Sequence, residues 1–248
     1  MLTPHLAPGG YIVSAQNGLN EKVIAARIGA ENTVGCFVNY GADWLEPGRI
    51  LFGNRAAVAV GELNGSMSDR VAEIHALLQL VEPDAVATDN IWGYLWGKMS
   101  YGSLLFCTAL TPDSMSDAMG RPQHRAAYRA LGHEVMTLAA HEGVAPLGFN
   151  GFDPAAFRAN DTVAIDVAMD KMVAHNRKTA KTHSGIWRDL AVRKRKTEVD
   201  AQIGVMVDLG REAGIALPTL ARMVELIHDI EDGKREQSAE LVDLLVAA

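Results

Sequence analysis

The hydrophobic pattern of this chain changes near residue 90, and that change limits the folds open to it. Before this point, short runs rich in β-branched and aromatic residues alternate with turn residues, as in strands. From Ile91 onward these runs disappear and apolar residues recur at helical spacing. A chain of 248 residues has room for two such parts. We predict a β-rich domain over residues 1–90 and an all-α domain over residues 91–248, an α+β or α/β architecture.

The first domain is expected to contain several short strands and a helix. Strands are predicted at residues 11–15 and 33–40, and residues 48–62 are predicted to form a hairpin that turns at Gly53-Asn54. Apolar spacing over residues 68–81 predicts a helix with Ser68 or Asp69 as its N-cap. A last strand is expected in "DAVATDN", residues 84–90.

The second domain is predicted to be a series of helices. Thr197 is a suitable cap for a helix that opens at Glu198, Gly214 can end that helix in a left-handed conformation, and Pro218 suits the first turn of the next one. The predicted helices cover residues 91–110, 122–142, 153–174, 184–195, 198–213 and 218–231, with a weaker one at 236–246.

Composition excludes several classes of protein. The net charge of −7 disfavours nucleic acid and anionic membranes as partners. Only two cysteines are present, Cys36 and Cys107, so a disulfide scaffold is excluded. The start of the sequence lacks the pattern of a secretory leader, and no run approaches the roughly 20 apolar residues of a membrane span. His133 and His141 lie too far apart for a zinc-protease helix. We expect a soluble cytoplasmic protein without a metal site.

Lys98 is the first candidate for chemistry. It could be an ordinary surface lysine, but its neighbours Leu95, Trp96 and Met99 are apolar, so we expect the segment to be largely buried. A lysine in such a place needs a partner and can have a lowered pKa. Those properties suit a proton donor near neutral pH.

Three further features each have a structural and a functional interpretation. Asn17 and Gly18 form a turn dipeptide, or an amide at the carboxyl end of a strand, where α/β sheets bind ligands. The basic segment 175–198 is a solvated helix face or a wall that binds phosphate or carboxylate groups. Ser184 follows His183 but lacks the sequence of a nucleophile elbow, so a serine hydrolase is not expected.

Several short motifs follow one another in order: "QNGLNE" after a strand, then "EPGRILFG", "LWGKM", "HSGIWRDL", "KTEVDAQIG" and "GIALP". This order resembles the ketopantoate reductase (2-dehydropantoate 2-reductase) family over about residues 10–232. The most specific part is "KTEVD" followed by "GIALP", and "LWGK" about 100 residues earlier supports it.

The resemblance implies an oxidoreductase of pantothenate biosynthesis that uses NADPH to reduce a 2-oxo acid to a 2-hydroxy acid. The family's site lies between a dinucleotide-binding domain and a helical domain. By resemblance, Lys98 protonates the ketone oxygen, Glu198 binds substrate and sets the state of the lysine, and Asn17 with Gly18 lies against the nicotinamide. Ser184 matches the serine that contacts the substrate carboxylate, although the spacing from Asp189 to Glu198 is one residue longer than usual.

Two departures from the family pattern bear on substrate and cofactor. Gly102 and Phe106 stand where the family has asparagines, so a more apolar 2-oxo acid than ketopantoate is expected. The chain has no G-x-G anywhere, so we expect a remnant of the Rossmann-type domain, its closing strands, and no tight NADP binding by this chain alone. Strand 11–15 would then lack parallel neighbours and leave sheet edges exposed. Association with another chain or a rearranged sheet would relieve this, and a homodimer is expected.

Three hypotheses remain open from the sequence. The first is a reductase of the ketopantoate type. The second is a non-catalytic helical dimerisation or ligand-binding module derived from such an enzyme. The third, a nucleic-acid binder that uses residues 177–196, is the weakest because its aromatic interleaving is limited to Trp187.

Overall fold

The computed structural model of the chain describes residues 3–179 and 181–246. It forms two compact units, Met1–Leu95 and Trp96–Ala248. The division falls inside helix α3 (Ile91–Ala109), a few residues beyond the change of pattern in the sequence. The roles assigned to the two domains, a cofactor domain and a substrate or dimerisation domain, stay predictions.

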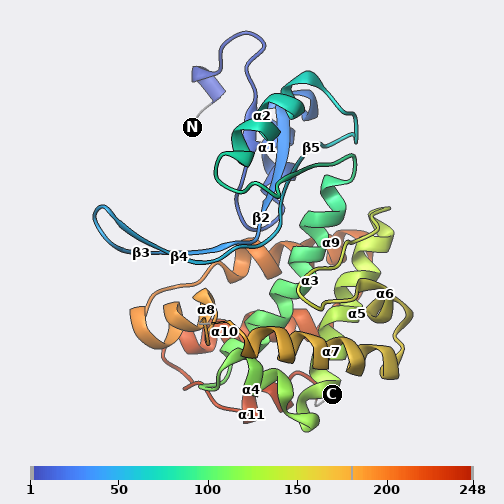
Figure 1. Ribbon diagram of the computed structural model, residues 1–248. Helices are drawn as coiled ribbons and strands as arrows, with labels where there is room; N and C mark the ends of the chain where they lie inside the picture. The colour runs from blue at the N-terminus through green and yellow to red at the C-terminus, as the bar shows by residue number, and fades with distance from the viewer. Residues whose placement is uncertain (1–2, 180, 247–248) are drawn as a thin grey trace. The chain divides into compact units, whose positions relative to one another are not determined.

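A four-stranded sheet forms the centre of the first unit (Figure 1). Its order is β1-β2-β5-β6, and β1 with β2 and β5 with β6 are parallel pairs, whereas β2 and β5 are antiparallel. Its strands are β1 (Ile12–Ser14), β2 (Thr33–Val38), β5 (Val58–Glu62) and β6 (Val86–Ala87). Short 3₁₀ turns lie at Thr3–His5 and Ala30–Asn32.

Helix α1 (Asn20–Ile28) corrects the expectation for the first strand. It connects β1 to the parallel strand β2, so the two strands and the helix form a βαβ unit. The prediction that strand 11–15 lacks a parallel neighbour is therefore wrong. The sequence pattern did not reveal α1 because its N-cap, Leu19, makes no side-chain hydrogen bond to the helix.

The predicted hairpin exists but is displaced along the chain. Strand β3 (Gly41–Glu46) pairs with β4 (Arg49–Asn54) in a separate two-stranded sheet, which extends as an arm in Figure 1. The turn is Pro47-Gly48, not Gly53-Asn54, because Gly48 adopts φ +79° and proline favours the position before it. Strand β5 pairs with β2 instead of β4.

Helix α2 (Asp69–Gln79) packs on this sheet and closes the core of the first unit. Its N-cap is Ser68, as predicted, and the Ser68 hydroxyl accepts a hydrogen bond from the Val71 N–H at 3.3 Å. One buried cluster of this core consists of Val34, Val60, Val71 and Ile74. Burial of each of these side chains contributes roughly 1.5–3 kcal/mol.

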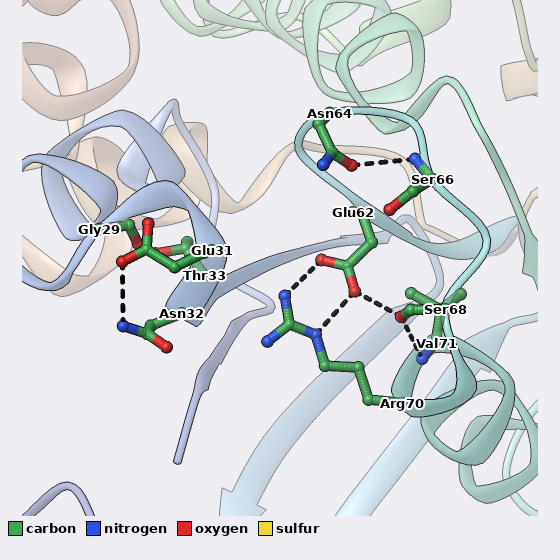
Figure 2. A network of polar contacts seen from close by, with 10 residues as sticks. All are labelled: Gly29, Glu31, Asn32, Thr33, Glu62, Asn64, Ser66, Ser68, Arg70 and Val71. Carbon is green, nitrogen blue, oxygen red and sulfur yellow. Dashed lines mark hydrogen bonds and ion pairs between the residues drawn. The ribbon is translucent and has the colours of Figure 1, made fainter. Parts of the chain in front are cut away.

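A partly buried ion pair joins the end of β5 to α2 (Figure 2). Arg70 donates to both carboxylate oxygens of Glu62, from Nε at 2.6 Å and from Nη2 at 2.5 Å. The Ser68 hydroxyl donates a third bond to this carboxylate at 2.5 Å. The Arg70 guanidinium, through its hydrogen bonds, holds the pKa of Glu62 below its usual value.

The second unit is all-α, as predicted. Several predicted helices agree with the structure, but the predicted helix 153–174 is interrupted where Asn160 adopts φ +51° and Asp161 caps a new helix. The predicted helix 236–246 is shorter and covers only Glu240–Asp243. A short helix at Met115–Gly120 was not predicted from the pattern. The helices after α3 are α4 (Met115–Gly120), α5 (Arg125–His141), α6 (Pro154–Ala159), α7 (Thr162–Arg177), α8 (Gly185–Arg188), α9 (Val205–Ala213), α10 (Pro218–Glu231) and α11 (Glu240–Asp243), with a 3₁₀ turn at Pro122–His124 and π-helical turns at Asp189–Arg193 and Asp200–Gly204.

Each unit contains one cysteine, and both cysteines are buried thiols. Cys36 lies on β2 in the first unit, and Cys107 lies on α3 in the second. Complete burial raises the pKa of the Cys107 thiol to about 12. Across the described part of the chain, no helix has the length and apolar character needed to cross a bilayer.

Candidate active site

Lys98 lies in the first half of α3, on a helix that is otherwise mostly buried. Its neighbours Trp96 and Met99 are in the core, whereas Lys98 itself is only half-buried. The expectation that the segment around this lysine is largely buried is therefore confirmed. Gly102, one helical turn further on, lies on the same face as Lys98 because side chains four residues apart are neighbours on a helix.

Glu198 lies at the start of the helix that continues into α9. Its side chain is exposed, and its carboxylate accepts a hydrogen bond from Gln202 Nε2 at 2.8 Å. The Gln202 N–H also donates to the Glu198 carbonyl at 3.0 Å. The π-helical turn Asp200–Gly204 follows directly, and such turns occur frequently at functional sites.

Gly102, on the same face of α3 as Lys98, lies close to Gln202, on the helix that carries Glu198. A Cβ atom added at Gly102 would lie 3.9 Å from Gln202 Oε1, and no other atom outside the local helix backbone would lie within 4 Å of it. Gly102 is one turn from Lys98, and Gln202 is one turn from Glu198. Two segments about 100 residues apart in sequence are thus brought together within the helical unit. Direct contact between the Lys98 and Glu198 side chains stays a prediction.

Sequence reasoning did not identify Gln202. The signal available for it is its spacing of four residues from Glu198, which places both side chains on one helix face. What the sequence could not show is that the glutamine amide faces the glycine of α3.

The two positions that depart from the family pattern have different surroundings. Phe106 is completely buried, so its ring belongs to the core of the helical unit. If Phe106 took the place of an amide that faces the site, part of its ring would be exposed, but the ring is completely buried. Gly102 is half-buried and has open space beside it, so it is the position of the two that enlarges the site.

Ser184 occupies a capping position. Its hydroxyl accepts a hydrogen bond from the Trp187 N–H at 3.1 Å at the start of α8, and the residue is only 3% exposed. The neighbouring His183 and Trp187 rings are stacked with centroids 3.9 Å apart. A contact of Ser184 with substrate stays a prediction.

Asn17 and Gly18 lie between β1 and α1 in the first unit, at the carboxyl end of a parallel strand. Gly18 is buried and adopts φ +95°, a conformation that favours glycine. Asn17 is exposed, and its carbonyl accepts a hydrogen bond from Asn20 Nδ2 at 2.6 Å. The turn interpretation of this dipeptide is confirmed, and its role toward a cofactor stays a prediction.

Part of the basic segment is neutralised within the helical unit. Arg193 and Arg195 both donate to Asp189, at 2.8 Å and 2.9 Å. Residues 3–179 and 181–246 contain no group of three or more histidine, cysteine or acidic residues arranged to hold a metal ion.

The fold is that of two-domain reductases and dehydrogenases. A PanE/ApbA family ketopantoate reductase from Ralstonia eutropha JMP134 superposes with a TM-score of 0.73 at 20% identity, over 94% of this chain and 70% of the other. A D-mandelate dehydrogenase, solved with NADH and anilino(oxo)acetate, superposes with a TM-score of 0.75 at 19% identity, over 92% and 69% of the two chains.

The sequence defines the family within this class. The model of the ketopantoate reductase PanE/ApbA C-terminal domain matches residues 90–231, more than half of the chain. The chain therefore belongs to the ketopantoate reductase PanE/ApbA family. It is also 24% identical to the 2-dehydropantoate 2-reductase of Archaeoglobus fulgidus over 225 residues, which are 90% of this chain and 69% of that protein.

Proposed function

We propose that this protein reduces a 2-oxo acid to a 2-hydroxy acid with NADPH or NADH, using Lys98 as the general acid and Glu198 as a substrate-binding carboxylate. The observation that carries the proposal is the approach of the α3 face to the start of the Glu198 helix, where Gly102 faces Gln202. This approach, together with membership of the family, supports a common site for Lys98 and Glu198.

The proposed chemistry depends on the charge that develops at the substrate oxygen. When bound, the nicotinamide cofactor supplies hydride to the carbonyl carbon of a 2-oxo acid. The Lys98 ammonium would stabilise the negative charge that develops on the oxygen and donate a proton to it. The Glu198 carboxylate, held by Gln202, would accept a hydrogen bond from the substrate and favour the charged form of Lys98.

The residues proposed to lie against the cofactor are Asn17 and Gly18. The positive φ of Gly18 and its missing side chain allow a ligand to approach the backbone closely. The sequence has no G-x-G turn to cradle a pyrophosphate, so weak cofactor binding by this chain is part of the proposal.

The space beside Gly102 supports a substrate with a large apolar group. A Cβ atom at this position would meet only Gln202 Oε1, at 3.9 Å, so the glycine leaves room that an asparagine side chain would fill. The structurally similar D-mandelate dehydrogenase was solved with anilino(oxo)acetate, a 2-oxo acid derivative that carries an aromatic ring. We therefore propose an aryl-substituted 2-oxo acid as substrate in preference to ketopantoate.

The substrate proposal predicts the effect of filling this space. The variant Gly102→Ala is expected to stabilise the fold by about 0.5–1 kcal/mol, because glycine is unfavourable inside a helix. Gly102→Leu is expected to reduce kcat/KM for phenylglyoxylate more than for pyruvate. Steady-state kinetics with both acids would test this, and equal losses for the two would argue against the aryl substrate.

A non-catalytic ligand-binding or dimerisation module is the second candidate, favoured by the missing glycine-rich turn. The two candidates differ in their response to cofactor and substrate. A reductase should show thermal stabilisation by several degrees at millimolar NADPH or NADH. It should also consume the cofactor, followed by absorbance, with phenylglyoxylate or ketopantoate. Neither stabilisation nor turnover is expected of the module.

Assembly as a homodimer and a cytoplasmic location also belong to the proposal. Both follow from the family resemblance and the composition of the chain. Light scattering coupled to size-exclusion chromatography would measure the mass of the assembly. A mass near 26.7 kDa, that of one chain, would contradict the dimer.

A further inference from the structure

The segment just before Glu198 is tied to the C-terminal end of α10. The carboxylate oxygen Oε1 of Glu231, the last residue of α10, accepts two hydrogen bonds from Thr197, one from its N–H and one from its hydroxyl, both at 2.7 Å. The same Thr197 hydroxyl accepts a hydrogen bond from the Val199 N–H at 3.2 Å. One residue before and one residue after Glu198 are therefore linked to a single carboxylate.

Two additional contacts join the same elements. His228 Nε2 lies 3.0 Å from Asp200 Oδ1, and Lys196 Nζ lies 4.0 Å from Asp232 Oδ1. Val199, next to Glu198, is completely buried. The last turn of α10 thus contacts the chain on both sides of Glu198.

Helix α10 is itself fixed at its opposite end. Both carboxylate oxygens of Glu134, on α5, accept hydrogen bonds from backbone N–H groups at the start of α10, from Thr219 and from Leu220, each at 2.9 Å. A carboxylate at a helix N-terminus stabilises that end, because the helix dipole is positive there. The position of Glu231 is therefore set by an element that is anchored to α5.

We propose that Glu231 is a positioning residue for Glu198. By holding both donors of Thr197, it fixes the backbone direction with which the chain enters the Glu198 helix. The Glu198 carboxylate is exposed and at the end of a flexible side chain, so this backbone direction decides where it can meet a substrate. This role rests on the proposed reductase function, in which Glu198 binds the 2-oxo acid.

Hydrogen bonds to a charged acceptor are stronger than those between neutral groups, so their loss should release the segment. In Glu231→Ala, amide hydrogen exchange over residues 197–204 is expected to rise by roughly tenfold or more, as for the loss of an interaction of this size. The control is Glu225→Ala on the same helix, whose carboxylate is exposed and pairs with Arg222 at 2.8 Å. Exchange over residues 197–204 should be unchanged in this control.

Kinetics with phenylglyoxylate and NADPH test whether the position matters for the reaction. Glu231→Ala is expected to raise KM by roughly tenfold with a smaller change in kcat. In a Glu198→Gln background the same substitution should change KM less than about twofold, because a residue that acts through Glu198 has no further effect once that carboxylate is removed. Thr197→Val, which loses the hydroxyl bond but keeps the backbone N–H bond to Glu231, should give a smaller change in the same direction. Thr197→Ser, which keeps the hydroxyl, should resemble the wild type.

The outcomes separate this role from the proposed function. Unchanged exchange in Glu231→Ala, or a full tenfold effect that persists in the Glu198→Gln background, would overturn the positioning role in an enzyme that is active. A wild-type chain that reduces no 2-oxo acid would overturn the proposed function, and with it the effect of Glu231 on the reaction. Thr197→Val gives a second measurement of the same contact if Glu231→Ala does not fold.

Discussion

Glu62, at the end of β5, is bonded to residues at the start of α2, and Glu198 lies at the start of the helix that continues into α9, but their surroundings are opposite. Glu62 is 5% exposed, and its carboxylate is held by two bonds from Arg70 and one from Ser68. Glu198 is exposed and accepts from Gln202, a neutral amide of its own helix.

The difference separates a structural carboxylate from one that can serve a ligand. The acceptor sites of Glu62 are used by groups of its own unit, and its charge is matched by Arg70 at close range. Glu198 keeps access to solvent, while the backbone beside it is fixed through Thr197 and Glu231. The position of this carboxylate is set by hydrogen bonds to the neighbouring backbone, and the carboxylate itself stays accessible to a ligand.

The largest expected effect on stability comes from removing the partner of the buried carboxylate. Arg70→Met leaves the buried Glu62 charge without its guanidinium, which should cost about 3 kcal/mol of unfolding free energy. The matched control is Arg49→Met, because Arg49 and its partner Glu46 are 70% and 60% exposed and such pairs contribute little. Urea denaturation would measure both, and equal losses would show that Glu62 and an exposed carboxylate do not differ.

Lys98→Ala is expected to have the largest effect on activity. If Lys98 is the general acid, kcat should fall by around a hundredfold or more with little change in melting temperature. Lys171→Ala, which removes an exposed lysine of α7, is the control and should keep wild-type turnover. Full activity of Lys98→Ala would remove the proposed mechanism.

Glu198→Gln should have a smaller effect, confined to the reaction. Loss of its charge is expected to raise KM by roughly tenfold, equivalent to one hydrogen bond of a charged group. The unfolding free energy should change by no more than about 1 kcal/mol, the size of a helix-dipole contribution. Glu225→Gln, an exposed carboxylate on α10, should change neither quantity. A large loss of stability in Glu198→Gln would place Glu198 with Glu62 as a structural residue.

The smallest expected effect is on the pH dependence of stability. It tests whether burial also shifts the pKa of an ionisable group in the helical unit. Burial lowers the pKa of His124 below 6.5, against the opposing effect of the Asp243 carboxylate. The unfolded chain therefore binds a proton more readily at this site, and stability should be lost as the pH falls below about 6.5. Urea midpoints at pH 7.5 and 5.5 would measure this loss, which should be smaller in His124→Asn.

The helical unit was more predictable from the sequence than the first unit. Its helices have apolar stripes and local end signals, such as Gly214, which adopts φ +70°, and Pro218 in the first turn of α10. In the first unit, the Gly53-Asn54 pair looked like a turn but belongs to a strand, and α1 had no capping side chain to mark its start. Local chemistry marks helix ends well, whereas strand pairing depends on residues distant in sequence.

The candidate site was predictable only in its parts. Lys98 and Glu198 were chosen from their neighbours and from the family resemblance. The approach of Gly102 to Gln202 spans 100 positions in the sequence, and the Thr197–Glu231 contact spans 34, so no local pattern contains either. Such contacts depend on how the helices pack. Hydrophobic periodicity shows which face of a helix is buried but not which helix packs against it.

The two buried cysteines give the protein a separate internal probe in each unit. A thiol reagent can reach Cys36 only when the sheet of the first unit opens, and Cys107 only when α3 leaves its neighbours. Because Cys107 stays protonated at neutral pH, its labelling is slow until that opening occurs. Mass spectrometry of the two labelled peptides would therefore show whether added cofactor or 2-oxo acid protects one half of the chain, the other, or both.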